Sequence, residues 1–311
     1  MDAFGDPLPA SDDYEYFEEV GHGRFSEIYR AKDRQSGCEV AMKYLTLSQQ
    51  RDGLPVPVQR EVAALQALQG HPNILKYHGL YQNDFGVSIV LEYLPTSLST
   101  ILKQEKPSDS WVVNVVSQVL KGLEACHQNS IVHRDLSPNN ILIDESCVVK
   151  LADFGISISQ NEKDKSVHRS NTPGMGTLWY MAPEILLGST LYTTAVDIWS
   201  VGCIIVEMVL GHSPFKGRSD LHQLCSIIDV LGTPDESSWP GLSEQLPDWG
   251  KLEFKHVDAK DWDDVFDMDQ IQNPSSKELL SLAKKMIVFN PNNRISATEA
   301  LKSNIFHSTN I

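Results

Sequence analysis

Two short stretches near the middle of the chain carry side chains suited to moving phosphate. The loop "HRDLSPNN" places Asp135 five residues before Asn140, and "LADFGIS" supplies Asp153 soon afterwards. A carboxylate such as that of Asp135 could accept the proton of an attacking hydroxyl group. The side-chain oxygens of Asn140 and Asp153 are hard ligands of the kind that Mg²⁺ binds. This order of residues predicts a phosphoryl-transfer site.

An amine that could bind phosphate lies upstream, where "VAMK" ends a predicted strand at Lys43. The helix that follows carries Glu61, and a buried pair of the two would hold the amine against phosphates. Taken singly, Lys43 could be a solvated strand end and Glu61 a surface acid. A random chain would rarely place these residues in order before Asp135, Asn140 and Asp153, and this favours the functional interpretation.

A glycine-containing turn precedes Lys43 in "VGHGRFSEI". Gly21 and Gly23 match a phosphate-binding glycine loop, while Ser26 replaces its third glycine and Ile28 its valine. Small residues there would let backbone N–H groups approach phosphate oxygens. An ordinary hairpin with glycines in its turn explains this isolated match as well.

The elements that must position these side chains change in kind along the chain. Residues 1–13 combine proline, glycine and acids, which predicts a mobile tail. From Tyr14 to about Leu91, the segments "YEYFEEV", "EIYRAKD", "CEVAMKYL" and "GVSIVLEYL" are typical of strands. One helix interrupts them in "VQREVAALQALQ", with Pro57 in its first turn. The apolar face of this helix carries Val58, Val62, Leu65 and Leu68.

After Pro95 the pattern becomes helical. "DSWVVNVVSQVLKGLEACHQN" predicts a buried helix capped by Ser108 or Asp109. Further helices are predicted for "AVDIWSVGCIIVEMVLG", "DLHQLCSIIDVLG", "SSKELLSLAKKMIVF" and "SATEALKSN", with an ordered insert over about 233–273. A sheet-rich first third and a helix-rich remainder predict an α+β protein with two lobes.

Composition and charge narrow the class of protein. With 41 acidic and 26 basic residues, the net charge of −15 argues against a general polyanion binder such as a nucleic-acid protein and favours basic or neutral partners. No apolar run is long enough for a membrane span, and the first residues are acidic, unlike a signal peptide. The five cysteines form no C-x-x-C pair. We therefore expect an intracellular protein with reduced thiols that pack in the interior.

Taken together, these motifs resemble those of the eukaryotic protein kinases, from Tyr14 to about His307. The resemblance implies a kinase domain over 14–307, with an N-lobe over about 14–92, a hinge over about 92–95 and a C-lobe over about 96–307. It also implies that Glu184 of "APE" pairs with Arg294 and that Asp197 braces the catalytic loop.

Four further motifs look like those of a cyclin-dependent kinase or a near relative in the CMGC group. They are "GLPVPVQRE", "VDIWSVGCIIVEM", "IIDVLGTPDESSWPGL" and "FNPNNRISATEAL", and they are most similar to the cell-cycle-related kinases associated with activation of other cyclin-dependent kinases and with cilia. This likeness implies a place in cytoplasm, nucleus or cilium. It also suggests a cyclin-like subunit docked on Val56 and Val58, unless these valines bury against their own lobe.

The resemblance implies ATP and Mg²⁺ as cofactors and protein serine or threonine as the acceptor. The tyrosine-kinase run Ala-Ala-Arg is absent from "HRDLSPNN". Lys43, held by Glu61, would bind the α- and β-phosphates, and Asn140 and Asp153 would hold the metal. The adenine would lie against Val20, Ala41, Leu91 and Leu142 and bond to the backbone of Glu92 and Leu94.

The chain departs from the family pattern at Ser137, where a lysine usually contacts the γ-phosphate. A serine brings no charge, and losing one charged donor costs on the order of 2–4 kcal/mol in transition-state stabilisation. We expect an active but slow enzyme, with an inactive nucleotide-binding scaffold as the alternative.

The predicted activating phosphosite is Thr172, whose phosphate Arg60 and Arg134 would bind. Ile158 stands where the family places a third arginine, so we expect Thr172→Ala to have a modest effect on activity. Arg24 and Phe25 replace the inhibitory Thr-Tyr pair of cell-cycle kinases, which closes that route of control.

The segment "GMGTLWYMAPE" also departs from the pattern of proline-directed kinases. Gly176 and Met181 replace the usual valine and arginine near the substrate residue that follows the acceptor. Altered substrate preference and neutral change at a loop rim both explain these replacements.

Overall fold

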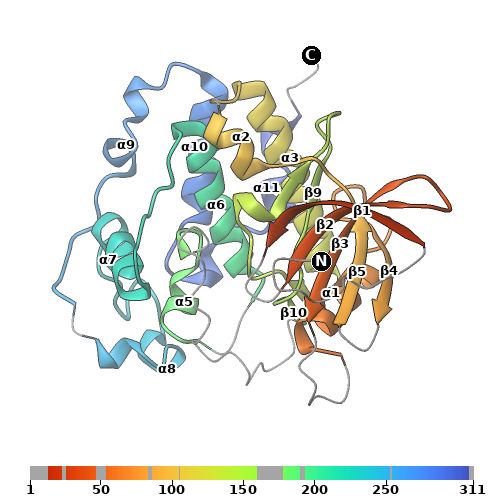
Figure 1. The fold of residues 1–311 in the computed structure, drawn as a ribbon. Helices are drawn as coiled ribbons and strands as arrows, with labels where there is room; N and C mark the ends of the chain where they lie inside the picture. Colours follow the sequence, from red (N-terminus) through yellow and green to blue (C-terminus); the bar gives the residue numbers. More distant parts are fainter. Residues whose placement is uncertain are drawn as a thin grey trace.

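The computed structural model divides into a β-rich lobe and a larger helical lobe, as the sequence predicts (Figure 1). The described residues are 13–22, 26–46, 54–82, 86–104, 106–159, 178–189, 193–252 and 254–307. Within them no helix has both the length and the apolar character to cross a bilayer. The predicted sites Gly23, Arg24, Phe25, Thr172 and Gly176 and the tail before Asp13 lie outside these ranges.

The first lobe is built on an antiparallel sheet of strand order β1-β2-β3-β5-β4. Its strands are β1 (Tyr14–His22), β2 (Glu27–Asp33), β3 (Glu39–Thr46), β4 (Tyr77–Gln82) and β5 (Gly86–Glu92). Side chains alternate between its faces. Val40 and Met42 of β3 pack in an apolar cluster with Tyr29, while Ala41 and Lys43 face the cleft between the lobes.

Strand β4 is one element that the sequence pattern did not predict. Its pairing with β5 shifts register between Tyr77 and Gly79, where a β-bulge or similar irregularity interrupts the ladder. A glycine inside a strand weakens the alternating signal from which strands are recognised. The strand forms here because the neighbouring β5 is buried and needs a partner on that edge.

Helix α1 (Val56–Ala67) begins as predicted, with Pro57 in its first turn. Val58 and Leu65 are buried, Leu68 is buried at the helix end, and Val62 is half-buried. Glu61 is buried as well. The helix therefore presents a carboxylate to the interior of the lobe, and the interpretation of Glu61 as a surface acid is wrong.

The second lobe is mainly helical. Its principal helices are α2 (Leu98–Gln104), α3 (Asp109–Gln128), α5 (Pro183–Leu186), α6 (Ala195–Leu210), α7 (Asp220–Leu231), α10 (Pro274–Met286) and α11 (Ala297–Ala300). Ser108 caps α3, its hydroxyl accepting from the Trp111 N–H. Helix α6 is buried along most of its length and lies at the centre of the lobe. Gly202 lets α10 approach, because a Cβ there would lie 2.9 Å from the Met286 Cβ.

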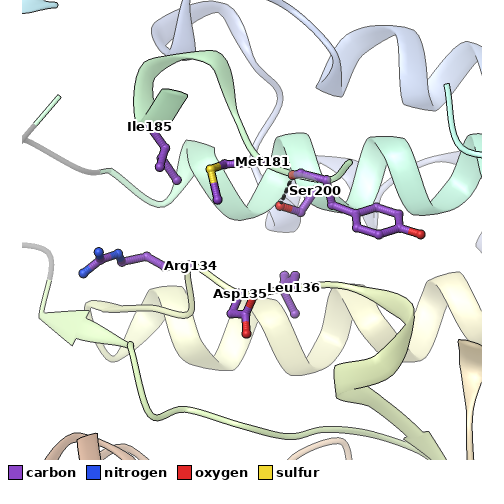
Figure 2. Close-up of a pocket in the computed structure, with 7 residues that line it drawn as sticks. Arg134, Asp135, Leu136, Met181, Ile185 and Ser200 are labelled. Carbon is purple, nitrogen blue, oxygen red and sulfur yellow. Dashed lines mark hydrogen bonds between the residues drawn. The ribbon is translucent and has the colours of Figure 1, made fainter. Parts of the chain in front are cut away.

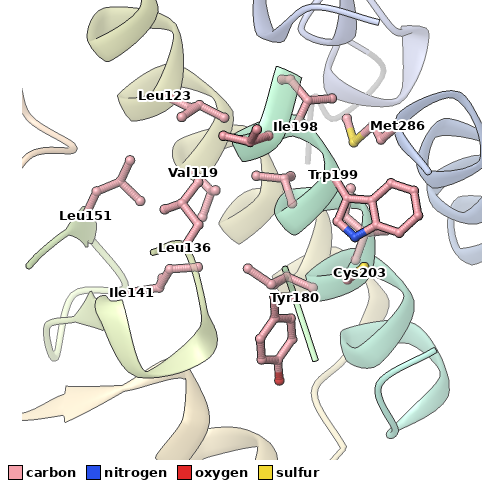
Figure 3. Close-up of a cluster of buried hydrophobic side chains, with 14 of the residues drawn as sticks. Val119, Leu123, Leu136, Ile141, Leu151, Tyr180, Ile198, Trp199, Cys203 and Met286 are labelled. Atoms are coloured by element: carbon pink, nitrogen blue, oxygen red, sulfur yellow. The ribbon is translucent and has the colours of Figure 1, made fainter. Parts of the chain in front are cut away.

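Short elements connect the helical lobe to the cleft. They are β6 (Thr96–Ser97), β7 (Ile131–Val132), η1 (Pro138–Asn140), β8 (Ile141–Ile143), β9 (Val149–Leu151) and β10 (Ile158–Ser159). Leu136, from the loop between β7 and η1, is buried where α3 and α6 meet (Figure 3). That loop is therefore fixed to the core of the lobe.

The predicted insert over 233–273 packs as an ordered segment. Its short helices are α8 (Leu242–Gln245), η2 (Trp249–Lys251), α9 (Trp262–Val265) and η3 (Met268–Gln270), and η4 (Pro291–Asn293) and η5 (Asn304–Phe306) follow later. Trp239 and Trp262 are buried in the main core. These aromatic side chains hold the irregular backbone of the insert in place.

Candidate active site

A cavity of about 420 Å³ lies between the two lobes. This volume is typical of small-molecule sites. The structure places on its wall all the residues predicted to bind nucleotide, apart from Gly23: Val20, Gly21, Ser26, Ile28, Ala41, Lys43, Leu91, Glu92, Leu94 and Leu142. Tyr93, Ser97 and Thr100 also line it. No spacing motif marked those three.

Lys43 is the centre of an ionic cluster in which Lys43 and Glu61 are buried and Asp153 is partly exposed on the cavity wall. Its Nζ lies 2.7 Å from Glu61 Oε2 and 2.9 Å from Asp153 Oδ1. Burial alone would lower the pKa of Lys43, but the two carboxylates outweigh it and raise the pKa, so the amine is charged. Lys43 in turn lowers the pKa of Asp153. The structure thus brings together three of the predicted site residues, from β3, α1 and the segment after β9.

Strand register explains how Lys43 reaches this position. It lies opposite Ile28 on β2 and Ile89 on β5, so all three side chains share the face of the sheet that covers the cleft. Helix α1 lies against the same lobe and turns Glu61 inward. The interpretation of Lys43 as a solvated strand end is therefore wrong.

Asp135 and Asn140 form the second group of predicted residues. Asn140 Nδ2 donates to the backbone carbonyl of Asp135 at 2.7 Å and to its Oδ2 at 3.0 Å. Burial, with the charge of Asp153, raises the pKa of Asp135 to about 7, against the opposing hydrogen bond from Asn140. A carboxylate with this pKa is well matched to take up and release a proton near neutral pH.

These residues fit a magnesium ion held jointly by protein and phosphate. Because Asn140 uses its amide nitrogen on Asp135, its Oδ1 is the atom left for a metal, and Asn140 and Asp153 both line the cavity. Among the described residues, no three His, Cys, Asp or Glu side chains gather as a complete metal site. Mg²⁺ commonly takes only one or two side-chain oxygens and completes its shell with phosphate and water.

The backbone that carries Asp135 is braced by Asp197, as the family resemblance implies. This buried carboxylate accepts from the N–H of His133 at 2.9 Å and of Arg134 at 2.8 Å. Its Oδ2 also lies 3.0 Å from His127 Nε2. Arg134 has φ 70°, a conformation that non-glycine residues adopt only with support. Asp197 provides that support.

The expected pair of Glu184 and Arg294 is present below the site. Arg294 Nη1 and Nη2 donate to the two carboxylate oxygens of Glu184 at 2.6 and 2.8 Å. This bidentate pair is buried and fixes α5 to the segment after α10.

A second, water-sized cavity of about 10 Å³ lies beside Asp135 (Figure 2). Its lining residues are Arg134, Asp135, Leu136, Tyr180, Met181, Ile185 and Ser200. The Ser200 hydroxyl donates to the Tyr180 carbonyl at 2.8 Å. Met181 and Ile185 form an apolar wall of this cavity, close to Asp135, where the substrate hydroxyl is predicted to bind. This agrees with the expected replacement of the usual arginine by Met181.

The predicted regulatory residues are placed only in part. Ile158 is buried and pairs with Val132 between β10 and β7, so it strengthens apolar packing where an arginine would bind phosphate. Arg60 and Arg134 are half-buried, and Thr172 lies outside the described residues. The use of these arginines on phosphate stays a prediction.

Ser137 is 1% exposed and lines neither cavity. Within the described residues its Oγ has no hydrogen-bond partner. A buried hydroxyl without a partner costs about 1–3 kcal/mol. The serine hydroxyl therefore does not reach the cavity in which phosphates would bind, and its effect on rate stays a prediction.

The two-lobed fold and the arrangement of Lys43, Glu61, Asp135, Asn140 and Asp153 define a protein kinase. The family model for the protein kinase domain matches residues 14–306, and the chain belongs to this family. It is also similar to cyclin-dependent kinase 20 of Danio rerio, with 35% identity over 293 residues that cover 93% of this chain and 82% of that protein. Within the family the chain is of the cyclin-dependent-kinase-like type of the CMGC group.

Proposed function

We propose that this chain transfers the γ-phosphate of Mg-ATP to serine and threonine hydroxyls of proteins. Its membership of the protein kinase family supports the reaction class. The observation that carries the proposal is the ion pairing of Lys43 with both Glu61 and Asp153 on the wall of the cavity. This cluster presents an amine and carboxylates together, as a magnesium triphosphate requires.

In this mechanism the apolar residues of the two lobes enclose the base, and the hinge orients it. The Glu92 N–H already donates to the Lys76 carbonyl at 3.0 Å. Of the backbone groups of Glu92, only the carbonyl could therefore bond to adenine, with the Leu94 N–H as a donor beside it. Lys43, held by Glu61, orients the phosphates.

Asp135 positions the attacking hydroxyl and takes its proton as the new oxygen–phosphorus bond forms, while the bond from the γ-phosphorus to the β–γ bridging oxygen breaks and ADP leaves. Asn140 holds the Asp135 carboxylate through its amide nitrogen. When bound, Mg²⁺ neutralises the charge on the phosphate oxygens, and Asn140 and Asp153 are the residues that would hold it. Asp197 fixes the backbone of the loop that carries Asp135 by accepting the N–H groups of His133 and Arg134.

Replacing Asp153 tests the proposal directly. We expect Asp153→Ala to abolish phosphate transfer to a generic basic protein, because the site loses a metal ligand and the partner of Lys43. Asp258→Ala is the matched control, because it removes the same type of side chain at a position that is 97% exposed and takes no part in the cluster around Lys43. Equal transfer by Asp153→Ala and wild type would remove the assignment.

The alternative function is a nucleotide-binding scaffold, which the buried Ser137 favours. Steady-state phosphorylation by wild type and Ser137→Lys separates the two. Turnover by the wild type supports the enzyme. If neither protein turns over while calorimetry registers Mg-ATP binding, the scaffold is correct.

Two features of the chain support a substrate preference: the loop "HRDLSPNN" for the type of acceptor residue, and Met181 for the residue that follows the acceptor. The absence of the Ala-Ala-Arg run after Asp135 supports serine and threonine over tyrosine. The replacement of the usual arginine by Met181, which lines the small cavity beside Asp135, supports acceptance of residues other than proline after the acceptor. A peptide library screen would show this as a broad preference at that position, and a strict requirement for proline would contradict it.

The start of α1 is the proposed contact for a cyclin-like subunit, a partner class supported by the name of the similar Danio rerio protein. Val56 is 53% exposed, whereas Val58 is buried in its own lobe. Only Val56 is thus available, and Val56→Glu should reduce co-purification of such a subunit. We further propose a location in cytoplasm, nucleus or cilium, which imaging of the tagged chain would test.

A further inference from the structure

Arg30 lies on strand β2, just beyond the part of the sheet that lines the cavity. On β2 it follows Ile28 by two residues, and its partner across the sheet is Ala41, which in turn lies opposite Leu91. Ile28, Ala41 and Leu91 all line the cavity. Residues in such a row share one face of a sheet. Arg30 therefore belongs to the cavity face, one step nearer the hinge.

The guanidinium group of Arg30 is held on its edges by two carboxylates. Its Nε and Nη2 donate to the two oxygens of Glu39, at 3.1 and 2.5 Å, and its Nη1 donates to Glu18 at 3.1 Å. The Glu39 contact is bidentate, which fixes the plane of the group as well as its position. Hydrogen bonds to Glu39 and Glu18 raise the pKa of Arg30, so its charge is permanent.

The guanidinium carbon of Arg30 lies over two aromatic rings. Arg30 Cζ is 5.3 Å from the ring centroid of Tyr93 and 5.5 Å from that of Phe17. Both distances are within the range of cation–π attraction. Phe17 is 47% exposed and Arg30 is only partly buried, so the arginine with its carboxylates and rings forms an outer layer that adjoins the cavity wall at Tyr93.

Tyr93 links this layer to the hinge. It lies between Glu92 and Leu94, the residues whose backbone would bond to the base, and it lines the cavity itself. On the other side, the Glu92 carboxylate is 2.8 Å from Lys150 Nζ on β9. The hinge is therefore tied to the second lobe through Glu92 and to the sheet of the first lobe through Tyr93.

We propose that Arg30 is a positioning residue for the nucleotide: by holding the Tyr93 ring, it sets the spacing between the sheet and the hinge backbone. The inference rests on the proposed function, because it assumes that the base lies between these two walls. Arg30 does not touch the reacting phosphate, so its loss should weaken nucleotide binding more than it slows the chemical step.

Calorimetry with ADP and Mg²⁺ tests this on the full chain. We expect Arg30→Met to raise the Kd about three- to tenfold, the range that a partly exposed cation–π contact allows. Arg30→Lys, which keeps the charge, should recover part of the loss. Lys32→Met is the matched control, because Lys32 lies two residues further along β2, is exposed and carries the same charge. Its Kd should equal that of the wild type.

A double-mutant cycle shows whether the effect passes through the hinge. Tyr93→Leu removes the ring, and after that change Arg30→Met should weaken binding by less than twofold. In steady-state assays the loss should fall on KM for ATP and not on kcat. If Arg30→Met fails to fold, Tyr93→Leu alone carries the test and should raise the Kd to the same extent.

The outcomes separate the two proposals. No binding heat with wild type would overturn the proposed function and, with it, the role of Arg30. Binding by wild type with an unchanged Kd for Arg30→Met and Tyr93→Leu would overturn the role of Arg30 alone. Equal weakening by Lys32→Met would also overturn it, because the cause would then be net charge.

Discussion

Two ionic clusters in this molecule, one fully buried and one on the wall of a cavity, serve different ends. Arg294 and Glu184 form a neutral pair in which every guanidinium donor is used: two bonds go to Glu184 and three to the carbonyls of Ala195, Val288 and Phe289. Lys43 instead shares one positive charge between Glu61 and Asp153, on the wall of a cavity. The charges of the Arg294–Glu184 pair cancel, and the pair is shut off from solvent. The Lys43 cluster carries one more negative charge than positive charges and borders a cavity.

The difference suggests how a functional buried charge can be told from a structural one. A balanced pair with all donors used needs nothing more, and it holds two segments together. An excess of negative charge on the wall of a cavity instead favours the binding of a cation there. The excess beside Lys43 thus points to a metal and its anionic ligand, and the predictions that follow separate catalytic loss from structural loss.

Lys43→Met should have the largest effect and should appear in catalysis. It removes the charge that orients the phosphates, so kcat/KM for phosphate transfer should fall on the order of 10³–10⁴-fold, or about 4–5.5 kcal/mol. Steady-state kinetics with a protein substrate measures this. Lys216→Met is the control, because Lys216 carries the same charge but is exposed and lies over the Trp179 ring, outside the cluster. A loss below tenfold for Lys43→Met would contradict the assigned role.

Arg294→Met should have the next largest effect and should appear in stability. It leaves Glu184 as an unpaired buried charge, and breaking such a pair lowers the free energy of unfolding by about 3–5 kcal/mol. Denaturant titration measures this loss. The Kd for ADP and Mg²⁺ of the folded variant should equal that of the wild type. A change in Kd with full stability would mean that the pair is functional.

The double variant Glu184→Leu with Arg294→Met sharpens that comparison. Removing both charges leaves no unpaired group, so it should regain part of the stability that Arg294→Met loses. A double variant that is less stable than Arg294→Met would contradict this. It would show that the remaining contacts of Glu184 stabilise the fold by more than its unpaired charge destabilises it.

Asp197→Asn should have the smallest effect of the three. The amide keeps one acceptor oxygen for the N–H groups of His133 and Arg134, where the carboxylate has two. Losing one buried hydrogen bond lowers the free energy of unfolding by about 1–3 kcal/mol. Calorimetric melting measures this, and kcat should fall with it as Asp135 loses its support. An unchanged kcat would show that the support from Asp197 stabilises the fold without affecting phosphate transfer.

Much of the fold and of the site could be predicted from the sequence because the chemistry is local. Asp135 and Asn140 belong to one loop, and their spacing already places the amide beside the carboxylate. The strands around Lys43 and the apolar face of α1 follow from simple periodicity. Proline and serine at the starts of α1 and α3 mark where these helices begin.

What the sequence could not show depends on register and on packing between distant segments. Arg30 meets Tyr93 only because β2 and β5 lie on either side of β3, and no spacing in the chain reveals that. Strand β4 lacked the alternating pattern around Gly79. The burial of Ser137 follows from the path of the loop over the core, whereas the family resemblance implied only that a lysine at this position contacts the γ-phosphate.

The attachment of Asp197 to the loop has a consequence for hydrogen exchange. Because the carboxylate lies in the first turn of the most enclosed helix of the lobe, the amide protons of His133 and Arg134 cannot reach solvent through a local opening of the loop. Their exchange with deuterium should follow global unfolding. The catalytic loop would then be among the slowest-exchanging segments of the molecule, although it borders an open cleft.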